Sequence, residues 1–367
     1  MIIDDTPAQP RGEPLSRRDL KNLVRNLGAA SRPSQRNSAR ATIKSLYIDA
    51  GTDSLASIAG VIPPLVQLLG SGSAAQVQAD ASALTKLAQN IDNQVVISAA
   101  GAIPRLVQLL NPVTPAEVRY HAAVVLSNLA VNADYQLAIA TAGAIPPLVL
   151  LLSPSSHIDL QYNAVCALGS LAENSDNQVT IAADGAIPLL VQMLGPGPPD
   201  RAAKNVQIVQ QHAACVLGCL ALNADNQVTI AAAGAIPPLV LLLSPSSHID
   251  LQCNAAGALA NLAQNDDNQV IIAAAAGPIP LLVQLLGPDS LAVVQCNAAG
   301  ALVNLAQNDD NQVTIAAAGA IPTLVRLLGP GSDTCASLNA ARTLELLGQS
   351  SAEHRASIAA AGARCQR

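Results

Sequence analysis

Three side chains near the middle of the chain could form a metal site. His212, Cys215 and Cys219 are spaced at i, i+3 and i+7, which places them on one face of a helix. Cys166 occupies the position of Cys215 in the preceding repeated segment. Imidazole and thiolate are the ligands that zinc and other soft metals prefer. No Cys-x-x-Cys pair occurs, however, and no fourth ligand is evident. The sequence therefore favours cysteines that pack as small apolar side chains, and it predicts no metal and no cofactor.

The other polar residues form no recognisable catalytic set. His157 and His248 are copies within SPSSHID segments, where the imidazole is expected to face solvent. No Ser or Cys nucleophile with an adjacent base and an orienting carboxylate can be identified. Glycine is plentiful, but no phosphate-binding glycine loop ends in Lys-Ser or Lys-Thr. The sequence predicts a protein that is not an enzyme, with no catalytic residues and no small-molecule substrate.

The composition indicates a helical core made of small aliphatic side chains. Half of the 367 residues are apolar, yet Phe and Trp are absent and there are only four Tyr. The net charge of −6 is unevenly distributed, since residues 1–50 carry nine Lys or Arg against five Asp or Glu, whereas residues 51–367 carry ten against twenty. Binding of a phosphate backbone needs clustered Lys and Arg, so nucleic acid is excluded as a predicted partner.

Cysteine usage and the first residues indicate where the protein acts. The seven cysteines show no small-domain disulfide framework, which favours a reducing compartment. The segment MIIDDTPAQP has acidic residues where a secretory signal needs a basic lead and an apolar run, and position 2 is not Gly. No apolar stretch is long enough to span a membrane. We expect a cytoplasmic or nuclear protein with no direct membrane anchor.

A repeated segment organises the chain. The string G-[AV]-I-P-x-L-V-x-L-L recurs from Gly60 onwards at spacings of 41, 42, 42, 49, 43 and 42 residues. The copies begin at Gly60, Gly101, Gly143, Gly185, Gly234, Gly277 and Gly319. This period is typical of armadillo and HEAT repeats. The single long spacing is attributed to a loop at 195–205, which adds about seven residues without disturbing the helices.

Each repeat is predicted to hold three helices. In the segment DNQVTIAAA, Asp310 is expected to cap the first helix and Gly319 to end it. Pro322 falls in the first turn of the second helix, whose buried stripe is expected to be Leu324, Val325, Leu327 and Leu328.

The third helix is clearest one repeat earlier, as VVQCNAAGALVNLAQN. In it Ala298, Ala301, Leu302 and Leu305 recur at helical spacing, and Asn308 is expected to end the helix in a left-handed turn. No single repeat can bury its apolar face alone, so stacking of repeats must form the core.

These patterns give a predicted domain organisation. We expect a flexible tail over 1–14, a partial N-terminal capping repeat over 15–59, and tandem repeats over 60–361. Two helices of the capping repeat are expected from Leu20, Val24, Leu27, Ala39, Ile43 and Leu46. Residues 362–367 follow a first helix near 352–361 with no second or third helix after it, which suggests either a covering partner or a truncated sequence.

The motifs DNQVTIAAAGAIPPLV and NAAGALANLAQN resemble the armadillo repeat family, from about Leu15 to Gly362. Within that family the resemblance extends to plant and protist armadillo proteins, including U-box proteins, to vacuole-associated armadillo proteins, and to the importin-α array. It implies an all-α, right-handed superhelix of about eight repeats of about 42 residues. It also implies that the third helices line a concave groove that binds other proteins.

Importin-α uses an Asn of the third helix, with a Trp four residues earlier, to hold basic peptides. The Asn position is matched here by Asn128, Asn261 and Asn304, whereas other repeats have Lys86, Ser170 or Cys219 there. The Trp position holds residues such as Cys166, Cys215, Gly257 and Gly300. Without any Trp, the sequence gives little support to a nuclear-import adaptor.

A second polar row lies seven residues before the Asn positions. It includes His121, Asn163, His212, Asn254, Asn297 and Asn339. An amide can donate to and accept from a peptide backbone, and helices stacked about 8 to 10 Å apart repeat at the length of about three extended residues. The two rows form the candidate binding surface, which we call the ladder: Lys86, His121, Asn128, Asn163, Ser170, His212, Asn254, Asn261, Asn297 and Asn304.

The sequence thus predicts a non-catalytic scaffold that binds extended peptide segments of other proteins along the ladder. A second hypothesis is the substrate-recognition module of a U-box ubiquitin ligase without its catalytic domain, and a third is a vacuolar-type scaffold. For the ladder itself, the alternative is that the amides only satisfy neighbouring helix ends or face water. On the binding hypothesis, replacing Asn261 and Asn304 by Ala should weaken binding and leave thermal stability nearly unchanged.

Overall fold

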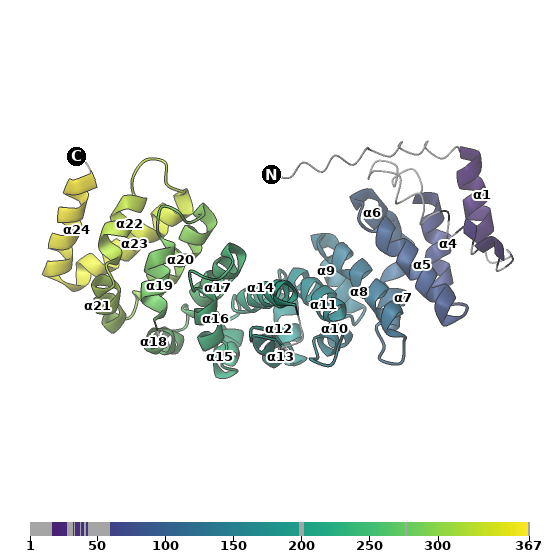
Figure 1. Ribbon diagram of the computed structural model, residues 1–367, viewed down its shortest axis with the longest axis horizontal. Coiled ribbons are helices and arrows are strands. Elements are labelled where there is room, and N and C mark those ends of the chain that lie inside the picture. Colours follow the sequence, from purple (N-terminus) through teal and green to yellow (C-terminus); the bar gives the residue numbers. More distant parts are fainter. Residues whose placement is uncertain are drawn as a thin grey trace. The chain divides into compact units, whose positions relative to one another are not determined.

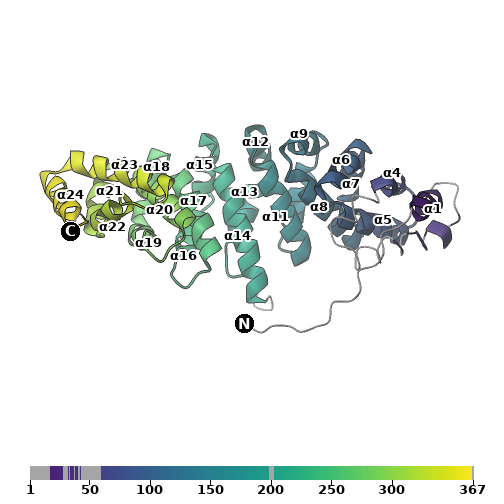
Figure 2. The same cartoon turned by 90° about the horizontal axis from the view of Figure 1, so that it is seen from above.

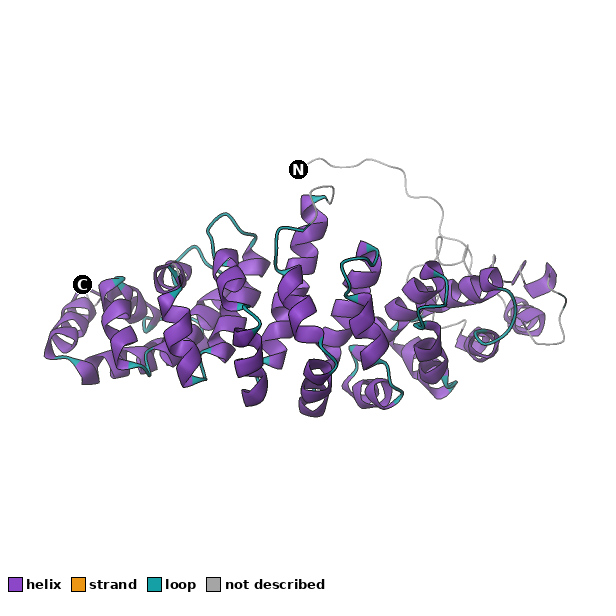
Figure 3. Ribbon diagram, turned by 90° about the horizontal axis from the view of Figure 1, so that it is seen from below, coloured by secondary structure: helices purple, strands orange, loops and turns teal. Residues whose placement is uncertain are grey.

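The computed structural model describes residues 17–27, 32, 34–36, 38–39, 42, 59–197, 202–275 and 277–365. Every regular element within these residues is a helix (Figure 3). The helices belong to two compact units, Met1–Leu151 and Leu152–Arg367. The predicted all-α fold is confirmed.

In the first unit, α1 (Arg17–Leu27) and the 3-10 helix η1 (Ala59–Val61) precede the repeated helices. The others are α4 (Ile62–Leu68), α5 (Ala74–Leu87), α6 (Ile91–Ala99), α7 (Ala102–Leu109), α8 (Ala116–Ala130), α9 (Ala133–Thr141) and α10 (Ile145–Leu151). A short second helix is followed by a longer third helix and then by the first helix of the next repeat.

The second unit continues this order with longer third helices at regular intervals (Figure 1). Its helices are α11 (Ile158–Leu171), α12 (Ser175–Ala183), α13 (Ala186–Met193), α14 (Ala203–Leu220), α15 (Ala224–Ala232), α16 (Ile236–Leu242), α17 (Ile249–Leu262), α18 (Asp266–Ala274), α19 (Pro278–Leu285), α20 (Ala292–Leu305), α21 (Asp309–Ala317), α22 (Ala320–Leu327), α23 (Thr334–Ser350) and α24 (Ala352–Cys365). The third helices α11, α14, α17, α20 and α23 pack one against the next.

The first helices are capped by asparagine. Asn308 lies in an extended conformation just before α21, and its side-chain oxygen accepts a hydrogen bond from the backbone N–H of Asn311 at 3.2 Å. The expected cap at Asp310 was therefore wrong, because Asp310 already lies in the first helical turn, where its negative charge is favourable. The expected left-handed turn at Asn308 was also wrong, since its φ is −89°.

Glycine separates the first helix from the second. Gly319 has φ of 78°, in the left-handed region, and a Cβ there would meet no atom within 4 Å. The backbone conformation therefore explains the glycine, and crowding does not. Pro322 lies in the first turn of α22 as predicted.

The buried stripe of α22 is confirmed in part. Leu324, Val325 and Leu327 are buried, but Leu328 is 45% exposed. The corresponding Leu286 is fully buried. Leu328 differs because it lines a pocket of about 560 Å³ that α23 and α24 leave uncovered.

The third helices supply the core. Ala298, Ala301, Leu302 and Leu305 of α20 are fully buried, as predicted from their helical spacing. Because these side chains face the buried side of the helix, the opposite side of each third helix is free to differ between repeats.

Buried amides of the DNQ motif join consecutive repeats. The Nδ2 group of Asn311 donates to the Leu305 carbonyl at 3.1 Å and to the Gln269 carbonyl of the previous first helix at 3.2 Å. Gln312 Nε2 donates to the Ala306 carbonyl at 2.8 Å. The bonds to Leu305 and Ala306 help to satisfy carbonyls at the end of the third helix α20, and the bond to Gln269 joins two consecutive first helices.

The long spacing between repeats lengthens a helix. α14 has 18 residues, against 14 in α11, α17 and α20, and it extends past the end of α11 (Figure 2). Ala203–Asn205 belong to this helix, so the expectation that the inserted residues form only a loop was wrong. The insertion adds a turn to the start of the third helix.

Part of the predicted capping repeat lies within the described residues. Leu27 on α1 and Ala39 are buried. Ile43, Leu46 and the predicted tail lie outside the described residues, and the domain boundaries at 14, 59 and 361 stay predictions. No single described helix is long and apolar enough to span a membrane, although two pairs of helices bent by about 90° meet these criteria jointly.

Candidate protein-binding surface

In the first unit, the ladder residues lie on neighbouring third helices. Lys86 is on α5, and His121 and Asn128 are on α8, and all three are half-buried. The hydroxyl of Thr85 lies 3.3 Å from Nδ1 of His121, which links the two helices. The three side chains thus lie on two neighbouring third helices, and their role in binding stays a prediction.

In the second unit, the amides on α17, α20 and α23 bridge adjacent third helices. Asn261 Nδ2 donates to the Gly218 carbonyl at 2.9 Å, and Asn304 Nδ2 donates to the Ala260 carbonyl at 2.8 Å. Seven residues earlier, the same bridge recurs: Asn254 to Gln211 at 3.1 Å, Asn297 to Cys253 at 3.0 Å and Asn339 to Cys296 at 3.3 Å. These bonds form two rows of contacts from each helix back to its predecessor.

These bridges change the expected effect of the Asn261 and Asn304 substitutions. Each alanine would remove a part-buried hydrogen bond between repeats, which contributes about 1 kcal/mol. The expectation of nearly unchanged stability is therefore wrong on physical grounds. The amides do have a stabilising role, although each also carries a second N–H and an acceptor oxygen.

Small residues lie beside the amides. A Cβ added to Gly257 would lie 3.2 Å from Nδ2 of Asn297, and one added to Gly300 would lie 3.5 Å from Nδ2 of Asn339. The amide of the next repeat therefore occupies the space beside each glycine. A large side chain such as Trp at position 257 would displace Asn297 from its bond to Cys253.

The ladder has different chemistry on α11 and α14. Asn163 is buried, and its Nδ2 donates to the Asp159 carbonyl of its own helix at 2.7 Å. Ser170 is half-buried on the same helix. His212 is half-buried on α14, and its ring lies edge-on to the Tyr162 ring at a centroid distance of 5.2 Å. Burial lowers the pKa of His212.

Four free thiols also lie on these third helices. Cys215 is exposed, whereas Cys166, Cys219 and Cys253 are partly buried. A hydrogen bond from the Cys219 thiol lowers the pKa of Cys215 to about 7. Burial raises the pKa of Cys166 to about 11. The helical spacing of His212, Cys215 and Cys219 was visible in the sequence, but the burial of Cys166 depends on tertiary contacts.

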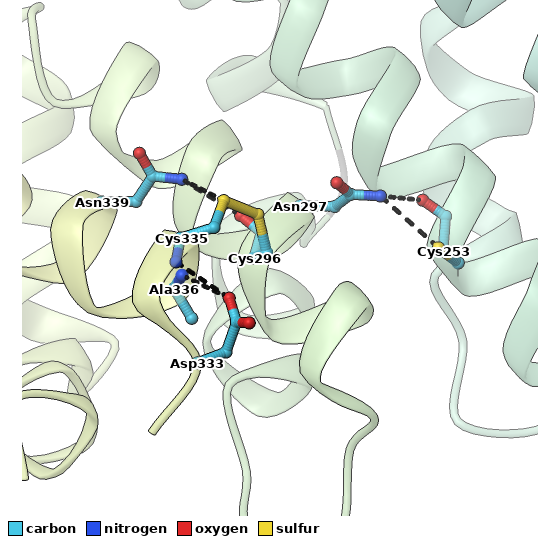
Figure 4. Close-up of a disulfide and its surroundings, with 7 residues drawn as sticks. All are labelled: Cys253, Cys296, Asn297, Asp333, Cys335, Ala336 and Asn339. Carbon is cyan, nitrogen blue, oxygen red and sulfur yellow. Dashed lines mark hydrogen bonds between the residues drawn. A yellow bond between two sulfur atoms is a disulfide. The ribbon is translucent and has the colours of Figure 1, made fainter. Parts of the chain in front are cut away.

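Two further cysteines form a disulfide between repeats. Cys296 of α20 and Cys335 of α23 are bonded, with Cα atoms 5.4 Å apart (Figure 4). The sequence showed no small-domain disulfide framework, and this pair forms between repeats because stacking of the third helices brings residues 39 positions apart into contact. Asp333 lies beside the pair, but its carboxylate caps α23 through Cys335 and Ala336. A disulfide has no thiolate to bind a metal.

Comparisons with known proteins agree with this architecture. The armadillo/β-catenin-like repeat model matches residues 90–131, 132–173 and 223–264. The crystal structure of an engineered protein aligns with a TM-score of 0.83 and 30% identity, over 94% of this chain and 82% of that one. The repeated three-helix units define a helical repeat solenoid, and the chain belongs to the armadillo repeat family.

Designed members of the family are also similar to this chain. One designed armadillo repeat protein aligns with a TM-score of 0.59 and 31% identity, over 67% of this chain and 99% of its own. Another, solved in complex with the peptide (KR)4, aligns with a TM-score of 0.57 and 26% identity, over 66% and 99%. No curated protein matches the sequence. Particular plant, protist or vacuolar relatives are not identified by these comparisons.

Proposed function

We propose that this chain is a non-catalytic scaffold that binds an extended segment of another protein across its third helices. The observation that carries the proposal is the regular series of half-buried amides on α17, α20 and α23, each held in place by a bond to the preceding helix. A side chain fixed in this way loses little conformational freedom when it binds a ligand. The designed relative that holds a peptide supports the same use of the fold.

In this proposal, the amides recognise the peptide backbone. Each bridging bond uses one N–H of the amide. On Asn254, Asn261 and Asn304 the second N–H and the oxygen bond a peptide group, whereas the Asn297 amide also donates to the Cys253 sulfur at 3.4 Å. The bound segment is extended, because its backbone groups then repeat at a spacing that can match successive helices. Specificity comes from the residues between the amides, which differ from repeat to repeat.

The proposed ligand differs from the basic peptide of the designed complex. The chain has no Trp, and Gly257 lies against the Asn297 amide, so no aromatic slot for a lysine stem is available there. We therefore favour a general peptide scaffold over an import adaptor. The recognition module of a U-box ligase remains the second hypothesis from the sequence, and finding a catalytic domain on a longer form of the protein would favour it.

The proposal places the chain in the cytoplasm or nucleus. Four of the described cysteines are free thiols, as is usual in a reducing compartment. Under such conditions the Cys296–Cys335 pair would be reduced. Microscopy of the tagged chain in its own cells would test this location, and a secretory location would contradict it.

Selection from a displayed library of random peptides tests the binding function directly. We expect peptides that bind the intact chain and bind the N261A/N304A variant at least about tenfold more weakly. Each hydrogen bond lost between an Asn amide and the peptide is worth about 1 kcal/mol, and the variant also loses side chains that are held in place before binding. The matched control is N311A, which removes two buried bonds to neighbouring helices away from the ladder.

Thermal melts of the three proteins separate binding from stability. An affinity loss confined to N261A/N304A supports the proposal, when all variants remain folded at the assay temperature. Equal loss in N311A would assign the effect to destabilised repeats. Failure to select any peptide, or unchanged affinity in N261A/N304A, would contradict binding along the ladder.

A further inference from the structure

The free thiols of the second unit are gathered around one exposed cysteine. Cys166 lies on α11, Cys215 and Cys219 on α14, and Cys253 on α17, so three consecutive third helices contribute. Cys215 and Cys219 are four residues apart on α14, so their thiols lie about one helical turn apart. Because Cys215 is the exposed one of these four described thiols, a reagent in solution reaches its sulfur first.

The neighbours of Cys215 favour its thiolate form. The Cys219 thiol stays protonated and acts as a hydrogen-bond donor to the Cys215 sulfur. This interaction lowers the pKa of Cys215 to about 7 and raises the pKa of Cys219. Burial raises the pKa of both Cys166 and Cys253. Because the thiolate is the nucleophile, Cys215 is the reactive member of the cluster at neutral pH.

A small cavity lies between α11 and α14. It has a volume of about 170 Å³ and is lined by Ile158, Asp159 and Tyr162 of α11 and by Asn205, Ile208 and Val209 of α14. Asn205 is in the helical turn that the insertion adds. Tyr162 links the cavity to the thiols, because it lies one helical turn before Cys166 on α11 and its ring contacts the ring of His212, three residues before Cys215.

The cavity suits part of a small polar thiol compound. Its aliphatic residues can cover a carbon chain, the Asp159 carboxylate can pair with an ammonium group, and the Asn205 amide can bond a carboxylate or a peptide group. Glutathione carries all of these groups next to its sulfur. The structure thus combines a nucleophilic thiol with a nearby site for the rest of the reagent.

We propose that Cys215 is a modification site at which glutathione disulfide forms a mixed disulfide with this chain. The Cys215 thiolate attacks one sulfur of the glutathione disulfide, and a new S–S bond forms as the original S–S bond breaks. The leaving glutathione thiolate takes a proton from solvent. Cys215 is oxidised and one glutathione is reduced, so the disulfide itself is the only oxidant.

The modification has a consequence for binding. The attached tripeptide covers the surface of α14 between α11 and α17, so that it competes with a segment bound there. This consequence rests on the proposed function, whereas the modification itself does not. Glutathionylation would then release a partner under oxidising conditions.

Intact-mass spectrometry of the whole chain after exposure to glutathione disulfide tests the site. We expect one glutathionyl group, mapped to Cys215 by digestion, with a rate that rises as the pH passes through about 7. C215S should remain unmodified, and C253S is the matched control that should react as the natural sequence does. Circular dichroism of each variant confirms that it is folded.

The C219A variant tests the mechanism of activation. Loss of the donor returns Cys215 toward its ordinary pKa, so the thiolate fraction at pH 7 drops to a few per cent and the reaction slows about tenfold. The rate should recover above pH 9. First modification at Cys166, Cys219 or Cys253, an equal yield in C215S, or an unchanged rate in C219A at pH 7 would overturn the proposal.

A binding measurement distinguishes this inference from the proposed function. The affinity of a library-selected peptide is compared for the unmodified and glutathionylated chain, and we expect weaker binding after modification. A chain that is modified at Cys215 but binds no peptide in either state would contradict the scaffold function and leave the modification site in place. Peptide binding that modification leaves unchanged would overturn the proposed competition alone.

Discussion

The third helices α17 and α20 differ from α11 and α14 on the side away from the core. On α17 and α20, Asn261 and Asn304 each reach back to a carbonyl of the preceding helix. On α14 the corresponding residue is Cys219, a free thiol one helical turn from Cys215 of the same helix. The fold therefore tolerates either amides or thiols at one position, because the buried side of the helix supplies the packing.

The largest expected effect is the loss of stability when a core leucine is replaced, and it should be the same in α14 and α20. Leu217 of α14 and Leu302 of α20 are corresponding residues, and both are fully buried. We expect L217A and L302A each to lower the free energy of unfolding by about 2 to 5 kcal/mol, through lost burial and a residual cavity. Denaturant unfolding measures both, and a much smaller cost for L217A would show that the thiol region packs differently.

An intermediate effect should separate the regions. N304A should cost about 1 kcal/mol, because it removes the bond to Ala260 of the preceding helix. C219A, at the corresponding position, should change stability by less than about 0.5 kcal/mol, since no bond to another repeat is lost. Equal costs in thermal or denaturant unfolding would argue that the amide bridges do not stabilise the stacking of repeats.

The smallest effect should appear with pH. Burial lowers the pKa of His212, so the folded chain resists the protonation that an unfolded histidine undergoes near pH 6.5. Stability is therefore unaffected above the unfolded pKa and decreases as the pH falls below it, toward the folded pKa. H212N, which introduces the residue found at Asn254, should lessen this decrease when melting is compared at pH 7 and pH 5.

If the unsubstituted chain and H212N lose the same stability between pH 7 and pH 5, His212 does not contribute to acid sensitivity. A larger loss in H212N would mean that the imidazole makes a favourable contact in its charged form. Asp159 lies on α11 and Glu173 follows the end of that helix, so both are acidic groups that could face a charged His212. The E173Q variant tests whether Glu173 is such a partner.

The repeated motif allowed much of the fold to be predicted. Gly319, Pro322 and the buried series Ala298 to Leu305 follow from helical spacing and backbone preference, which act over a few residues. Predictions failed where the outcome depended on a distant contact, or on which of two nearby residues caps a helix. Asn308 caps α21 in place of Asp310, the insertion lengthens α14, and Leu328 is exposed because no helix covers it as Leu286 is covered.

The sequence alone determined the repeat, its three helices and the residues that form the ladder, because each depends on periodicity along the chain. The tertiary structure decided what those residues do. Only the stacking of helices about 40 residues apart shows that Asn261 and Asn304 bridge repeats, and only it joins Cys296 to Cys335. The exposure of Cys215 and the burial of the thiols around it likewise depend on packing, which no pattern of neighbours in the sequence specifies.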